Sequence, residues 1–77
     1  MPRYYFDIHD DQFSTIDDTG AELVGVEAAK AHAIRVAASV AQDIFPRGQR
    51  ELVVAVRDAE KPVFSAKVVL TILATSG

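Results

Sequence analysis

Two side chains near the start of the chain are the strongest candidates for chemistry. Asp7 and His9 stand two residues apart in a segment that alternates apolar and polar residues, so in a strand both would leave the same face of a sheet. A carboxylate and an imidazole on one face make a two-point metal chelate, to which Asp10 or Asp11 could add an oxygen ligand. Zinc needs at least three well-placed protein ligands, and the spacing fixes only this pair. We therefore expect no metal and no cofactor, and we keep a metal-dependent enzyme using Asp7 and His9 as an alternative.

The other polar side chains do not suggest a catalytic group. His32 and Ser39 would lie along the exposed side of a helix, two turns or about 10 Å apart, which is too far for a histidine to activate a serine. The acidic turns lack the alternating ligands and the final glutamate of a calcium loop. Cysteine is absent, so no thiolate nucleophile and no disulfide can form. The sequence predicts a protein that is not an enzyme.

The charge distribution argues against nucleic-acid binding. The chain has 77 residues and a net charge of −3, whereas a nucleic-acid binder normally presents a basic stripe to the phosphates. Residues 1–22 hold six acidic side chains against one arginine, and the remainder is slightly basic. If the protein touched DNA, the contacts would come from the basic side chains Arg47, Arg50 and Arg57 with Lys61 or Lys67.

Length and hydropathy predict one small domain of the cytoplasm. No run reaches the roughly 18 apolar residues of a membrane-spanning helix, and the first residues lack the pattern of a signal peptide. We expect no membrane contact and a single α+β domain over residues 1–77, ordered from about 2 to 74. A chain of this length buries little apolar surface, so its stability should be modest unless a partner adds to the burial.

The apolar periodicity predicts the element order β-β-α-β-β. Strands are expected near Arg3–His9 and Phe13–Asp17, a helix over Val26–Phe45, and strands at Arg50–Asp58 and Val63–Leu73. The apolar face of the helix is mostly alanine, which lets the helix lie close to the sheet. Two hairpins would then form a four-stranded sheet with one long helix packed on one face. The strand order 2-1-3-4 is one arrangement that the hairpins allow.

The sheet face that the helix leaves uncovered is more apolar than a solvated surface requires. We expect self-association, as a dimer, through this second face or through an edge strand. Scattered exposed valines that need no partner are the competing interpretation. A non-enzymatic protein-interaction module is the leading hypothesis, and a regulatory protein of antitoxin or stress-response type is the second. The residues expected at the interface are Tyr5, Val53, Ala55, Val63, Val69 and Leu73.

Three segments together form a recognisable pattern. They are the start Met1–Asp7 (MPRYYFD), the segment Asp17-x-x-Gly20-x-Glu22-Leu23, in whose turn Gly20 should take a positive φ, and the helix start VEAA at 26–29. They resemble a set of short bacterial proteins classed as a domain of unknown function and typified by an M-P-R-Y-[YF]-F start. The resemblance implies a small intracellular bacterial protein and carries over no catalytic residues. The family pattern has a second Asp-x-x-Gly turn, at which this chain has Lys61 in place of the glycine.

Overall fold

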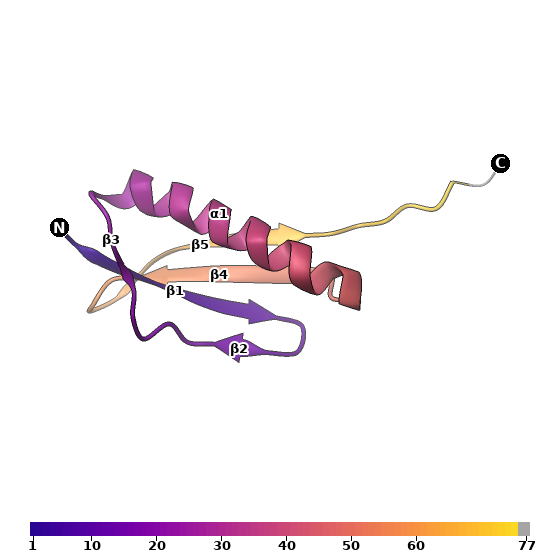
Figure 1. Ribbon diagram of the computed structural model, residues 1–77, viewed down its shortest axis with the longest axis horizontal. Coiled ribbons are helices and arrows are strands. Elements are labelled where there is room, and N and C mark those ends of the chain that lie inside the picture. The colour runs from indigo at the N-terminus through magenta and orange to yellow at the C-terminus, as the bar shows by residue number, and fades with distance from the viewer. Residues whose placement is uncertain (76–77) are drawn as a thin grey trace.

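The computed structural model describes residues 1–75 and shows one helix packed on one antiparallel sheet (Figure 1). The expected α+β fold with its hairpins around one long helix is confirmed, and the last two residues of the expected domain lie outside the described residues. A short additional strand, β3, pairs with β1. The elements in chain order are β1 (Arg3–Asp10), β2 (Ser14–Thr15), β3 (Ala21–Glu22), α1 (Val26–Ile44), a 3-10 turn (Phe45–Arg47), β4 (Glu51–Arg57) and β5 (Pro62–Val69).

The two hairpins join through their long strands. The sheet order is β2-β1-β4-β5. Counted over the four strands expected from the sequence, this is the order 2-1-3-4, in which the first and third expected strands (β1 and β4) are neighbours. β1 and β4 pair antiparallel with Phe6 opposite Val56 and Ile8 opposite Val54. This register places the apolar side chains of both central strands on the same face, and the sequence alternation excludes a slip by one residue, which would turn one set to the other face.

Two strands are shorter than the alternation predicts. β2 covers only Ser14–Thr15 of the expected Phe13–Asp17, and β5 ends at Val69 instead of Leu73. The end of β5 is set by its partner, because Glu51 is the first residue of β4 and lies opposite Val69. Beyond this point β4 itself has ended, and the pairing continues in one further backbone bond, from the N–H of Leu70 to the carbonyl of Arg50 at 2.9 Å.

The helix packs on the sheet through a row of three alanines. Ala29, Ala33 and Ala37 recur every four residues and are at most 2% exposed, so the backbone of α1 lies close to β4 and β5. His32 was expected on the exposed side, and this prediction is wrong. Its ring centroid lies 4.6 Å from that of Phe6 with the rings tilted by 56°. Position 32 is next to the alanine row on the helix surface, so a long side chain there reaches the sheet.

The core lies between the helix and the two central strands. Leu52, Val54 and Val56 on β4 are essentially inaccessible to solvent, and Tyr4 and Phe6 on β1 extend the same layer. Together with the three helix alanines they form one apolar cluster. The helix therefore covers only one face of the sheet, and the opposite face carries the remaining functional candidates (Figure 1).

Candidate functional site

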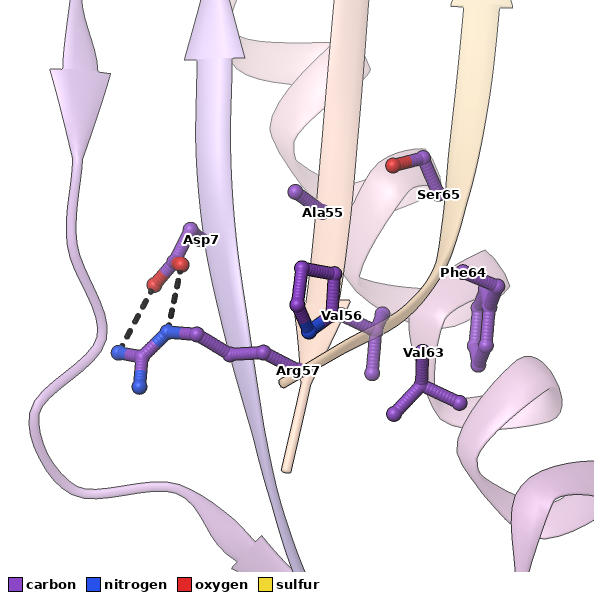
Figure 2. Close-up of a pocket in the computed structure, with 8 residues that line it drawn as sticks. Asp7, Ala55, Val56, Arg57, Val63, Phe64 and Ser65 are labelled. Carbon is purple, nitrogen blue, oxygen red and sulfur yellow. Dashed lines mark hydrogen bonds and ion pairs between the residues drawn. The ribbon is translucent and has the colours of Figure 1, made fainter. Parts of the chain in front are cut away.

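The uncovered face of the sheet holds an ion pair between its two central strands. Arg57 Nε on β4 donates to Asp7 Oδ2 on β1 at 2.8 Å, and Arg57 Nη2 lies 3.4 Å from Asp7 Oδ1. The two residues are diagonal neighbours, since Arg57 stands directly opposite Tyr5. The guanidinium carbon also lies 4.6 Å from the centre of the Tyr5 ring, a cation–π distance. Figure 2 shows this pair on the side of the sheet that faces away from α1.

A loop residue, Asp17, completes this cluster. Its backbone N–H donates to Asp7 Oδ1 at 2.9 Å, and its carbonyl accepts from Arg57 Nη2 at 2.8 Å. Its own carboxylate accepts the backbone N–H of Phe6 at 3.1 Å. The loop between β2 and β3 is therefore bonded to the edge of β1 and to a side chain from β4. We call the set Asp7, Asp17, Arg57 and Tyr5 the ion-pair cluster.

The electrostatics of the cluster keep both carboxylates ionised. The hydrogen bond from Arg57 lowers the pKa of Asp7, with a further contribution from the N–H of Asp17, and together they outweigh the effect of burial. Burial would raise the pKa of Asp17, but the N–H groups of Gly20, Phe6 and Thr19 reverse this and leave it below its ordinary value. A general acid or base at neutral pH needs a pKa shifted towards 7. The cluster instead bonds the loop between β2 and β3 to β1 and β4.

The two predicted metal ligands point to different partners. Asp7 is 7% exposed and is engaged by Arg57 and Asp17, while His9 Nδ1 lies 2.9 Å from Ser14 Oγ across the β1–β2 pair. In the part of the chain that the structure describes, no three metal-ligating side chains come together. The spacing of Asp7 and His9 correctly places both on one face, but it does not reveal what each one binds.

A shallow pocket lies beside the ion-pair cluster, between the end of β4 and the start of β5 (Figure 2). Its volume is about 250 Å³. Asp7 and Arg57 supply charged groups to its lining, and the rest is largely apolar: Ala55, Val56, Pro62, Val63, Phe64 and Ser65. Both charged side chains are already paired with each other, so the pocket presents a neutral, mostly apolar surface.

The six predicted interface residues do not all lie on one surface. Tyr5, Val53 and Ala55 are half-buried on the uncovered face, and Val69 is 58% exposed at the end of β5. Val63 instead packs against the core, because a bulge near Arg57 shifts the register and takes Val63 out of alternation. The remaining residue, Leu73, is 82% exposed and lies beyond the sheet.

The basic side chains of the second half are mostly paired with carboxylates. Lys67 Nζ lies 3.2 Å from Glu51 on the neighbouring strand, and Arg47 lies 3.8 Å from Asp43. With Arg57 bound to Asp7, three of the five basic residues that could have met DNA have acidic neighbours. Their charges are locally compensated, which weakens the case for a phosphate-binding stripe.

Three turns share one feature, an aspartate whose side chain caps the backbone of its own turn. The side chains of Asp10, Asp17 and Asp58 each accept the backbone N–H groups of the residues two and three positions further on, at 2.7–3.0 Å. Gly20 has a φ of 74° as predicted, whereas the Asp58 turn closes with Lys61 and no positive φ. Without the family glycine, this turn is closed by the two bonds to the Asp58 carboxylate and by the backbone bond from the Asp58 N–H to the Lys61 carbonyl at 2.9 Å.

The outer edge of β5 is open and continues into an extended apolar segment. Residues 70–75, which we call the extension, leave the body of the protein beyond β5 (Figure 1). Ile72 is 71% exposed and Leu73 is 82% exposed. Residues 68–75 carry no charged side chain. An exposed strand edge followed by apolar chain is the kind of surface that pairs with another strand.

These features define a small two-layer α+β domain with an ion-pair cluster on its uncovered face and a long open sheet edge at β5. The model of the family Domain of unknown function (DUF6894) matches residues 3–69, from the first residue of β1 to the last of β5, and the chain belongs to this family. The resemblance seen in the sequence to a family of unknown function is thereby confirmed. No curated protein and no solved structure matches the chain. In residues 1–75 no helix is long and apolar enough to cross a membrane.

Proposed function

We propose that this protein is a non-enzymatic protein-interaction module that self-associates as a dimer. The observation that carries the proposal is the open edge of β5 together with the exposed, uncharged extension that follows it. Unpaired backbone groups and apolar side chains in one continuous segment favour pairing with a further strand. The proposal includes either route expected from the sequence, the uncovered sheet face or an edge strand.

The uncovered face contributes less to this proposal than the edge does. Its centre is occupied by the Asp7–Arg57 ion pair, and a second pair joins Lys67 to Glu51. Covering these charges with another protein would remove them from water, which costs free energy unless every group keeps its partner. Tyr5, Val53 and Ala55 add apolar surface around the pairs, but they do not form an uninterrupted patch.

The two other functions considered from the sequence draw on side chains of which several are already engaged. A metal-dependent enzyme would use Asp7 and His9, which bind Arg57 and Ser14 respectively. A DNA-binding regulator would use basic side chains, of which Lys67 has a carboxylate partner. The interaction module requires no rearrangement of these contacts, and we therefore prefer it.

Sedimentation velocity of the purified full chain tests the proposal. We expect a species of twice the 8.3 kDa of one chain whose population rises with protein concentration. A single monomeric species over the whole range up to high micromolar concentration would refute self-association. A matched run in high salt should leave the dimer in place, because the association is proposed to rest on backbone hydrogen bonds and on the uncharged extension, not on charge pairs between the copies.

A further inference from the structure

The two edges of the sheet differ in how they are protected. The β1 edge is covered by β2 near His9 and by β3 near Tyr4. Between these strands the N–H of Phe6 points out of the edge and donates to the Asp17 carboxylate. β5 lies at the other end of the strand order. The strands outside β1, β2 and β3, have two residues each, so within residues 1–75 β5, with eight residues, offers the longest edge along which the sheet can be extended without breaking existing bonds.

The backbone bond at the end of β5 shows which of its residues direct their backbone groups towards β4 and which direct them outwards. Successive residues of an antiparallel strand direct their backbone groups alternately to the two sides. The N–H of Leu70 donates to the carbonyl of Arg50 at 2.9 Å, so the even-numbered residues face β4. The backbone groups of Ser65, Lys67 and Val69 consequently point outwards. If the extension keeps the same alternation, residues 71 and 73 continue this outward row.

The last two residues of β5 and the extension together have the composition of a β-strand. Residues 68–75 read VVLTILAT, with β-branched side chains at five of eight positions and no charge, proline or glycine. Pairing with another strand stabilises such a segment, and an exposed apolar segment of this kind commonly marks an interaction surface. It is joined directly to the open edge, so each copy of the chain offers both a strand to donate and an edge to receive one.

We propose that two copies pair β5 with β5 in antiparallel orientation, about a two-fold axis at Val69, so that the extension of each copy forms a strand beside β5 of the other. This inference rests on the proposed self-association and names its surface. The two sheets become one continuous sheet. Residues 65–73 of each chain form the new ladder, which supplies about ten backbone hydrogen bonds from five outward-facing pairs.

The charge and length of the segment select this register. An axis at Lys67 would place the two lysines directly opposite each other, which is unfavourable. An axis at Val69 places Lys67 opposite the partner's Thr71 and Ser65 opposite the partner's Leu73. On the helix side of the sheet, Ile72 lies opposite the partner's Ala66. Residues 70–73 of the extension are then paired, and each Lys67 keeps its bond to Glu51.

Disulfide trapping tests the register directly, because the chain has no cysteine of its own. In a hydrogen-bonded antiparallel pair the Cα atoms are about 5.5 Å apart, within the range that a disulfide spans. Under mild oxidation we expect Val69→Cys to form a covalent dimer and Val53→Cys, on the uncovered face, to remain monomeric on a denaturing gel. Lys67→Cys is the register control, and it should cross-link much less than Val69→Cys.

The outcomes separate this inference from the function on which it depends. A dimer in sedimentation that cross-links through Val53→Cys and not through Val69→Cys would keep self-association and refute the β5 surface. Cross-linking strongest at Lys67→Cys would refute the axis at Val69. A monomer in sedimentation would refute both proposals.

A second pair of variants tests the extension without any cross-link. Ile72 and Ile34 are 71% and 65% exposed, the first in the extension and the second on the helix. We expect Ile72→Asp to raise the dimer dissociation constant by at least about tenfold, because a carboxylate would be placed in the new ladder. Ile34→Asp should change it by less than about twofold. Equal effects of the two substitutions would contradict the inference.

Discussion

Replacing Asp17 by alanine should destabilise the protein far more than replacing its neighbour Asp18. The Asp17 carboxylate accepts three backbone N–H groups, from Phe6 at 3.1 Å and from Thr19 and Gly20 at 3.0 Å each. Asp18 is exposed, and its carboxylate receives only the Thr19 hydroxyl, at 3.3 Å. The two residues have the same charge and stand in the same loop, so Asp18→Ala is a matched control.

The size of the destabilisation follows from the hydrogen-bond acceptor that each backbone N–H loses. The Phe6 N–H is partly buried on the β1 edge, and a buried donor left without an acceptor costs about 1–3 kcal/mol. The Thr19 and Gly20 N–H groups lie nearer to solvent, and water replaces most of what they lose. We therefore expect Asp17→Ala to lower the free energy of unfolding by about 2–3 kcal/mol and Asp18→Ala by less than about 0.5 kcal/mol.

Urea unfolding followed by far-ultraviolet circular dichroism measures both values, since the chain has no tryptophan to report by fluorescence. Asp17→Asn should lie between alanine and wild type, because its amide keeps one oxygen acceptor. Comparisons must be made at one protein concentration, since a dimer couples unfolding to concentration. If Asp17→Ala and Asp18→Ala unfold within about 0.5 kcal/mol of each other, the cluster does not hold the loop as described.

Three further outcomes are expected. Val54→Ala should lower the free energy of unfolding by about 2–4 kcal/mol in the same urea assay, because the side chain is fully buried and its removal leaves a cavity. A loss below about 1 kcal/mol would mean that the neighbouring core side chains move in and fill the cavity. Gly20→Ala should also lower the free energy of unfolding, by about 1–3 kcal/mol, because the φ of Gly20 is 74° and a Cβ there would lie 2.9 Å from the Tyr4 carbonyl oxygen. An unchanged urea midpoint would contradict this geometry. The pKa values of Asp7 and Asp17 are held below the ordinary 3.8 in the folded state, so their contribution to stability is complete above that pH and is lost as the pH falls through the lower folded values. Urea midpoints measured in steps from pH 6 down to about pH 2 should therefore drop below pH 3.8 and drop less steeply in Asp7→Asn; a wild-type midpoint that stays level would refute the assignment.

Much of the fold can be predicted from the sequence because the apolar pattern is consistent along the chain. The alternation in β1 and β4 fixes which side chains face the helix, and the four-residue alanine spacing fixes the contact face of α1. The length of a strand is harder to predict from the sequence, because it depends on both paired strands. Residues 70–73 alternate like a strand, but β4 begins only at Glu51, so the ladder to β5 ends at Val69.

The ion-pair cluster was harder to predict than the fold. Asp7 and Arg57 are 50 residues apart in the chain, and only the β1–β4 register makes them diagonal neighbours. The sequence nevertheless contained an indication, since an aspartate in the middle of a strand needs a partner if it is buried. Val63 illustrates the opposite case, because a bulge shifts it by one position and no pattern in the sequence marks that shift.

The row of three alanines under α1 has a consequence for how related sequences can vary. Methyl groups set the separation of helix and sheet there, so Ala33 can be exchanged for a larger residue only if a facing side chain on the sheet becomes smaller. Substitutions along this seam should consequently be compensated in pairs among homologues, with a gain of volume on the helix matched by a loss on β4. Positions on the outer surface of α1, such as Arg35, are free of that constraint and should drift independently.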